Sequence, residues 1–181
     1  MKIAFTGAHG TGKTTLVGML LKNYPDHQQY TNIQRFFNKN LKNFPISSKA
    51  NDISQTAITS FLAFEIMTKD NIICDRSLID TFAYSDLSKN VKKSSEIRKT
   101  FEDALKYYDM IFYVPIEFKV EDDGLRELDE KFRIEVDKKI KYYIKKYKKI
   151  VPIYEIKGSI YERYDTISTI LFKTLKHSKG L

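Results

Sequence analysis

The chain has 181 residues, of which 42% are hydrophobic and 30% charged, so we expect one domain, residues 1–181, with a full hydrophobic core. No run of about 18 apolar residues occurs, so we expect no transmembrane helix, and the single cysteine, Cys74, excludes an internal disulfide. The three histidines are scattered and predict no zinc site. The N-terminus runs straight into the first predicted strand, so we expect no signal peptide and a cytoplasmic protein.

A phosphate-binding motif follows the first predicted strand. Residues 2–6 form a short apolar run, residues 7–14 fit G-x-x-x-x-G-K-[ST] at every fixed position, and residues 14–22 have the pattern of a helix. Glycines let the backbone bend tightly around an anion, while Lys13 reaches the β- and γ-phosphates and the Thr14 hydroxyl can bind Mg²⁺. The residues expected to bind nucleotide phosphates are Gly7, Ala8, His9, Gly10, Thr11, Gly12, Lys13, Thr14 and Thr15.

The next segment carries candidates for the acceptor side of the site. A break at residues 23–26 precedes a short predicted strand at 28–31. Arg35 follows that strand, where it could bind a substrate phosphate or be a surface arginine, and the sequence does not decide between them. Phe36, Phe37 and Phe44 could stack on a flat substrate, although core packing is the favoured interpretation.

A helix is predicted at residues 53–68, after a loop at 42–52. Gln55 lies in its first turn and is a candidate to read the edge of a nucleobase, although a solvated glutamine is the favoured interpretation. The helix predicted at 78–87 carries Tyr84, a second candidate for substrate contact.

Residues 71–77 combine three apolar residues with Asp75, Arg76 and Ser77. This pattern is typical of a buried parallel strand that delivers an acid to the carboxyl edge of the sheet. There Asp75 can hold Mg²⁺ or accept a proton, and Arg76 can bridge donor and acceptor phosphates. The alternative is that Asp75 caps the next helix. The upstream phosphate-binding motif favours the functional interpretation.

The segment at about 116–137 is a candidate lid. A helix predicted at 96–108 and a strand at 109–114 lead into it. Arg126 and Arg133 are seven residues apart and therefore share one helical face, from which they could stabilise the charge of a transferring phosphoryl group. The alternative is a surface helix in which Asp129 and Glu130 are their salt-bridge partners.

Much of the net charge of +8 lies between residues 138 and 149, where seven lysines occur without an acid. They spread around the helix, which favours a solvated helix and leaves a nucleic-acid surface as the alternative. The same helix, predicted to continue to about 149, has an apolar stripe formed by Phe132, Val136, Ile140, Tyr143, Tyr147 and Ile150.

A strand at 151–156, whose Pro152 indicates an edge position or a strand start, precedes a turn where Gly158 and Ser159 would lie beside adenine. The last helix covers 160–176.

Five strands separated by helices predict a doubly wound α/β fold with a parallel sheet. The motif at 7–14, the Asp75-Arg76-Ser77 strand end, the Arg126/Arg133 segment and residues 158–163 together resemble the small P-loop kinases, above all the NadR-like ATPase/kinase group and the thymidylate and deoxynucleoside kinases. The resemblance implies a three-layer fold with strand order 2-3-1-4-5 and a helical lid. It also implies ATP and Mg²⁺ as the phosphate donor and a small-molecule acceptor, with Asp75 and Arg76 between the two.

One departure from the family pattern bears on the acceptor. Many of these kinases have an acid three residues before the arginine that corresponds to Arg35, where this chain has Asn32. Asparagine cannot act as a base, so the departure favours a nucleoside monophosphate over a nucleoside. A kinase acting on a base or end within DNA and a regulatory ATP-binding or ATPase module are the alternatives. The sequence also leaves a homodimer open.

Overall fold

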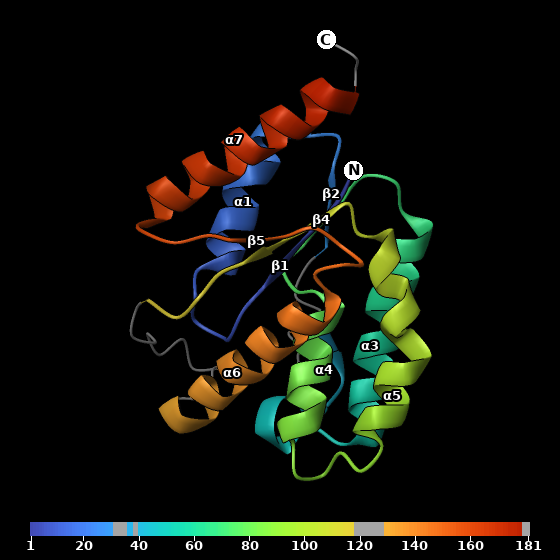
Figure 1. Ribbon diagram of the computed structural model, residues 1–181. Helices are drawn as coiled ribbons and strands as arrows, with labels where there is room; N and C mark the ends of the chain where they lie inside the picture. Colours follow the sequence, from blue (N-terminus) through green and yellow to red (C-terminus); the bar gives the residue numbers. More distant parts are fainter. Residues whose placement is uncertain (31–35, 38–39, 118–128, 179–181) are drawn as a thin grey trace.

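The computed structural model describes residues 1–30, 36–37, 40–117 and 129–178, and Figure 1 shows its ribbon. The strands are β1 (Lys2–Thr6), β2 (Gln28–Tyr30), β3 (Ile72–Cys74), β4 (Met110–Tyr113) and β5 (Ile153–Glu155). The helices are α1 (Lys13–Asn23), α3 (Asp52–Thr68), α4 (Leu78–Leu87), α5 (Ser94–Phe101), α6 (Glu130–Tyr147) and α7 (Ile160–Ser178), together with the short 3-10 helices η1 (Ser47–Lys49) and η2 (Glu102–Tyr107).

The strands form one sheet in the order β2-β3-β1-β4-β5, and every neighbouring pair is parallel. In the central strand, Ala4 is paired with Cys74 of β3 and with Ile111 of β4. Parallel strands direct their carboxyl ends to one edge, so the segments after β1, β3, β4 and β5 all begin at that edge. The predicted α/β class with a parallel sheet is confirmed. Pro152 immediately precedes β5, one of the two edge strands, as its sequence position indicates.

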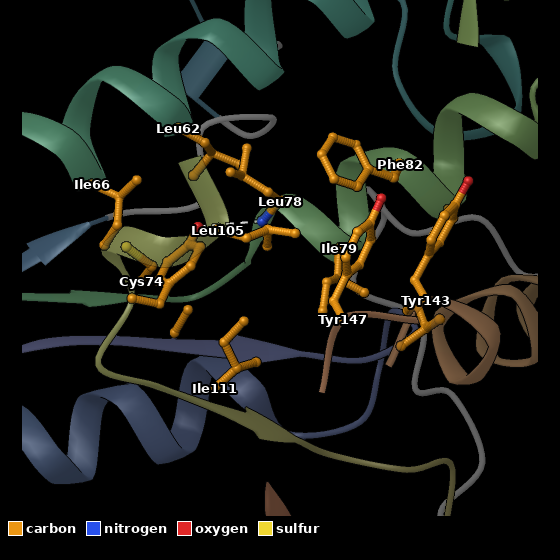
Figure 2. Close-up of a cluster of buried hydrophobic side chains, with 14 of the residues drawn as sticks. Leu62, Ile66, Cys74, Leu78, Ile79, Phe82, Leu105, Ile111, Tyr143 and Tyr147 are labelled. Atoms are coloured by element: carbon orange, nitrogen blue, oxygen red, sulfur yellow. Dashed lines mark hydrogen bonds between the residues drawn. The ribbon is translucent and has the colours of Figure 1, made fainter. Parts of the chain in front are cut away.

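Successive residues of the central strands face opposite layers of the molecule, because side chains alternate along a strand. Ala4 belongs to a hydrophobic cluster with residues of α3, α4 and α6, whereas Ile3 and Phe5 pack with residues of α1 and α7. Figure 1 shows α1 and α7 on one side of the sheet and α3, α4, α5 and α6 on the other. Figure 2 shows part of the first cluster, where the rings of Tyr143 and Tyr147 lie beside Phe82. The fold is therefore a three-layer sandwich.

The helices α5 and α6 are among those whose bounds differ from the prediction. The single helix expected at 96–108 is α5 followed by η2, which begins at Glu102. Helix α6 ends at Tyr147, so Ile150 lies beyond the helix and is 50% exposed. The stripe residues Val136, Ile140 and Tyr143 are buried as expected. A stripe at helical spacing predicts burial only as far as the helix itself continues.

The seven lysines of residues 138–149 lie on α6 and the turn after it, and several have acidic partners. Lys138 contacts Glu135 at 2.8 Å and Lys141 contacts Asp137 at 2.8 Å. Lys139 reaches Asp86 at 3.1 Å, and Lys146 reaches Glu102 at 3.1 Å. The acids absent from the lysine stretch are thus supplied by α4, by η2 and by the start of α6. These contacts support a solvated, ion-paired helix.

None of the helices that the structure describes is both long and apolar enough to cross a lipid bilayer. In the same part of the chain, no three His, Cys, Asp or Glu side chains gather as a candidate metal-binding group.

Candidate active site

The segment after β1 bends tightly at the carboxyl edge of the sheet before α1 begins. Gly7 has φ 152°, and a Cβ at that position would lie 2.4 Å from the backbone oxygen of Val114. Gly10 and Gly12 have φ values of 70° and 90°, in the left-handed region that favours glycine. Helix α1 starts directly after Gly12, so its first backbone N–H groups and the positive end of its dipole face this bend. Residues 7–14 therefore have the form of a phosphate-binding loop, which we call the P-loop.

Lys13 and Thr14 lie where this loop joins α1. Lys13 is buried, with 5% of the residue exposed, and its ammonium donates to the Ala8 carbonyl oxygen at 2.6 Å and to the Thr11 hydroxyl at 3.1 Å. The Thr14 hydroxyl donates to Oδ2 of Asp75 at 2.7 Å. The loop after β1 and the end of β3 are thus joined by a hydroxyl–carboxylate pair. Oxygen ligands of this kind suit Mg²⁺, so Thr14 and Asp75 fit a magnesium site.

The environment of Asp75 changes its acidity. Burial raises the pKa of Asp75, whereas the Lys13 charge, the Thr14 hydrogen bond and the Arg76 charge act against that rise. Asp75 does not cap the next helix, because the N-cap of α4 is Ser77. The alternative interpretation of Asp75 as a helix cap is therefore wrong. A buried carboxylate without a capping role is a candidate metal ligand or proton acceptor.

Asp80 ties the P-loop to the turn after β3, a role that our sequence analysis missed. Its Oδ1 accepts a hydrogen bond from the Gly7 backbone N–H at 3.1 Å. Its Oδ2 accepts from the backbone N–H and the hydroxyl of Ser77, at 2.9 and 3.0 Å. The spacing Ser77-x-x-Asp80 is that of a capping box, which could have revealed the helix start. The contact with Gly7 is long-range and has no signal in the sequence.

Arg76 and Tyr84 form a buried pair beside this turn. The Arg76 guanidinium lies over the Tyr84 ring, 5.2 Å from its centroid, and its Nη1 is 3.7 Å from Asp80. The Tyr84 hydroxyl lies 3.1 Å from Nδ1 of His9 in the P-loop. Within the described part of the chain, Nε and Nη1 of Arg76 are buried and have no hydrogen-bond partner. Such donors are rare in folded proteins, and a bound anion or water would satisfy them.

Gln55 was expected to be solvated, and this is wrong. It is fully buried because its face of α3 packs against α4, where its Oε1 lies 3.2 Å from the Ser85 hydroxyl. Its Nε2 has no hydrogen-bond partner among the described residues. Core packing was the favoured interpretation for three phenylalanines, and Phe37 and Phe44 do pack against the core. For Phe36 that interpretation is wrong, because its side chain is 53% exposed. Arg35, with the neighbouring Asn32, lies outside the described residues.

The candidate lid is described only in part. Arg126 lies outside the described residues. Arg133 is fully buried at the start of α6, where its Nη1 contacts Glu130 at 3.1 Å and its Nε donates to the His9 carbonyl oxygen at 3.0 Å. Glu130 is the salt-bridge partner named in the alternative interpretation. The hydrogen bond to the His9 carbonyl, however, brings Arg133 to the P-loop.

A second arginine, Arg163 of α7, also reaches the P-loop. It is fully buried, and its Nη1 donates to the Thr11 carbonyl oxygen at 2.7 Å. Its Nη2 pairs with Glu117 at 2.5 Å, and the same carboxylate oxygen accepts from the Gly158 backbone N–H at 2.9 Å. Gly158 and Ser159, the expected adenine-side turn, are thus linked to the P-loop. Neither Arg163 nor Glu117 was predicted as a site residue, although Arg163 lies within the family-like ending at 158–163.

Comparisons with known proteins agree with this architecture. A family model described as an AAA domain matches residues 2–163. No curated protein sequence matches the chain significantly. A deoxyadenosine kinase from M. mycoides, solved with the products dCMP and a flexible dCDP bound, is similar with a TM-score of 0.67 and 17% identity, covering 96% of this chain and 100% of that chain.

Two further solved structures share the arrangement. Thymidylate kinase from Candida albicans has a TM-score of 0.65 and 18% identity, covering 97% of this chain and 92% of that chain. The NadR protein in complex with NR has a TM-score of 0.70 and 19% identity, covering 93% of this chain but 50% of that chain. The predicted resemblance to small P-loop kinases is confirmed at the level of the fold. The chain belongs to the AAA domain family and has a P-loop kinase-like fold.

Proposed function

We propose that this protein is a kinase that transfers the γ-phosphate of ATP to a nucleotide or nucleoside, with a (deoxy)nucleoside monophosphate as the favoured acceptor. The observation that carries the proposal is the hydrogen bond of 2.7 Å from the Thr14 hydroxyl to the Asp75 carboxylate, which the Lys13 charge also influences. A metal-binding hydroxyl, a carboxylate and a phosphate-binding lysine at one edge of the sheet are the parts that phosphoryl transfer requires.

Each group has a distinct task on the donor side. The backbone N–H groups of the P-loop bind the phosphates, and Lys13 leaves the Ala8 carbonyl to contact the β- and γ-phosphates. Thr14 and Asp75 would hold Mg²⁺, and the ion would supply positive charge against the negative charge of the phosphates. Gly158 and Ser159 turn beside the adenine. Arg126 remains a proposed source of positive charge near the transferring group.

On the acceptor side, Arg76 offers two buried N–H groups, Nε and Nη1, that have no hydrogen-bond partner among the described residues. A phosphate between donor and acceptor would satisfy them bidentately. We assign Arg35, Phe36, Gln55 and Tyr84 to the acceptor as well. A monophosphate acceptor already carries an ionised oxygen and needs no base, which suits the asparagine at position 32. For a hydroxyl acceptor, Asp75 would take the proton.

Two other functions make different predictions. A kinase acting within DNA would use the lysines of α6, and its binding would weaken steeply with salt. The ion pairs of Lys139, Lys141 and Lys146 with acids of this chain argue against that use. A regulatory module would bind ATP but would show no turnover that depends on an acceptor.

The proposal is tested with a panel of nucleosides, nucleoside monophosphates and short DNA, each with ATP and Mg²⁺, by measuring ADP release. We expect release to rise with one class of small acceptor and to be unaffected by moderate salt. Release at the same slow rate with every acceptor would favour the regulatory module. Release that depends on DNA and falls steeply with salt would favour the DNA kinase.

A further inference from the structure

Cationic side chains bind four consecutive backbone carbonyls of the P-loop, those of residues 8–11. Lys13 donates to the first, Arg133 to the second and third, and Arg163 to the fourth. The first of these contacts comes from the lysine that is expected to move onto phosphate. The other two side chains come from α6 and α7, which Figure 1 shows on opposite sides of the sheet. The loop is therefore held from both outer layers of the fold.

Holding a carbonyl also fixes the orientation of the next N–H group. A peptide unit is planar and trans, so its C=O and its N–H point in opposite directions. Arg133, which contacts the His9 and Gly10 oxygens at 3.0 and 3.4 Å, fixes the N–H groups of Gly10 and Thr11. Arg163 fixes the Gly12 N–H in the same way. These three N–H groups belong to the stretch that binds phosphate in a P-loop.

Each arginine has an acidic partner that keeps it in place. Arg133 pairs with Glu130, one turn earlier on α6, and Arg163 pairs with Glu117, which follows β4. The two guanidinium groups are fully buried, and their hydrogen bonds to carbonyls are charge-assisted. Their geometry suits support of the loop backbone, which differs from direct contact with a transferring phosphoryl group.

We propose that Arg133 and Arg163 are positioning residues that preset the P-loop N–H groups for a triphosphate. This inference rests on the proposed function only for the identity of the nucleotide. Preorganisation of this kind lowers the cost of binding, so its loss weakens ATP affinity. A charge that acted only in the transition state would instead change kcat.

The test compares Arg133→Gln and Arg163→Gln with the wild type in two measurements. The first is amide hydrogen exchange of residues 10–12 without nucleotide, and the second is the ATP dissociation constant. Because each change removes charge-assisted hydrogen bonds to the loop backbone, we expect each measurement to change by about tenfold or more. We also expect kcat at saturating ATP to change by less than about threefold.

Arg98→Gln is the matched control. Arg98 lies on α5, contacts Asp86 at 3.5 Å and donates to the Tyr143 hydroxyl at 2.8 Å, and neither partner belongs to the P-loop. The control removes the same charge and should leave exchange at residues 10–12 and ATP affinity unchanged. A comparable effect of Arg98→Gln would overturn the proposal, because it would indicate a general loss of stability.

Two other results would also overturn it. One is unchanged exchange and affinity in both arginine variants, and the other is a large fall in kcat with unchanged affinity. If Arg163→Gln does not fold, Glu117→Gln replaces it, and unchanged loop exchange there would count against the role of Arg163. The exchange measurement needs neither ATP nor an acceptor, so a failure of the proposed kinase activity would be recognised separately.

Discussion

Two regions of this molecule are rich in charged side chains, and they use charge differently. In the first, which we call the loop cluster, buried charged groups converge on the P-loop; its members are Lys13, Asp75, Asp80, Arg133 and Arg163. In the second, the helix cluster, charged groups bind tyrosines and one another between α4, α5, η2 and α6; its members are Asp86, Arg98, Glu102, Tyr143 and Tyr147.

The partners of the charges distinguish the two clusters. Four members of the loop cluster bind backbone groups of residues 7–11, and the fifth, Asp75, binds the Thr14 hydroxyl. In the helix cluster, the Tyr143 hydroxyl donates to Asp86 at 2.6 Å and Tyr147 donates to Glu102 at 2.7 Å. Charged side chains that bind a glycine-rich backbone can orient its N–H groups toward a ligand. Charged side chains that bind other side chains instead hold helices together. Function should therefore depend on the first cluster and stability on the second.

The largest effect on turnover is expected for a lysine of the loop cluster and none for a lysine of α6. Lys13→Ala should abolish turnover, because no other described side chain offers positive charge at the same point of the P-loop. Lys146→Ala should leave kcat unchanged. It should change the free energy of unfolding by less than about 0.5 kcal/mol, since its pair with Glu102 is exposed. Steady-state ADP release and urea unfolding of both variants check this. Near-normal activity of Lys13→Ala would refute the assignment of the P-loop.

Asp75→Asn should lower turnover by about a hundredfold or more, because an amide is a poor magnesium ligand and cannot accept a proton. The same change should stabilise the ligand-free protein at neutral pH, since burial of Asp75 opposes its ionised form. Activity assays and thermal unfolding without Mg²⁺ measure the two effects. A variant with lower thermal stability at neutral pH would contradict the second expectation.

The pH dependence of that stability difference follows from the raised pKa of Asp75. An acid whose pKa is raised on folding contributes stability below its unfolded pKa of about 3.9 and loses that contribution as pH rises through the folded value. The Tm advantage of Asp75→Asn over the wild type should thus be small near pH 4 and grow toward pH 8. A constant difference over this range would mean that Asp75 does not titrate with a raised pKa.

Two glycine substitutions are expected to distinguish the P-loop from helix α1, which follows it. Gly7→Ala should cost at least about 2 kcal/mol, because its φ is positive and the new Cβ would meet the Val114 oxygen. Gly18→Ala, inside α1 with nothing within 4 Å of the new Cβ, should gain about 0.5–1 kcal/mol. Chemical denaturation of the two variants measures both values. A neutral Gly7→Ala would show that the loop has another conformation.

In the helix cluster we expect an effect on stability alone. Tyr143→Phe removes a hydrogen bond to the Asp86 carboxylate and should lower the free energy of unfolding by about 1.5–3 kcal/mol. Its kcat at a temperature where the variant is fully folded should equal that of the wild type. A changed kcat in the folded variant would show that the helix cluster takes part in function.

Local patterns predicted much of the fold. The strand at Lys2–Thr6 and the helix at Leu78–Leu87 have the predicted bounds, because apolar runs and helix starts are encoded by neighbouring residues. The motif at residues 7–14 likewise identified the loop, since its glycines serve the local bend. Asp75 was placed correctly at the end of a buried strand.

Contacts between distant elements could not be predicted in this way. Asp80 reaches Gly7, Arg163 reaches Thr11, and Gln55 turns toward Ser85, and each contact depends on how two elements pack. A buried polar residue at one end of such a contact resembles a surface residue in the sequence. The positions of Arg35 and Arg126 stay predictions.

The most direct test of the central claim follows the terminal phosphate of ATP itself. The protein is incubated with γ-labelled ATP, Mg²⁺ and the acceptor that stimulates ADP release most, and the label is traced. We predict that the label appears on the acceptor in amounts equal to ADP, and that Lys13→Ala transfers none. Label recovered only as inorganic phosphate, with or without acceptor, would contradict a kinase.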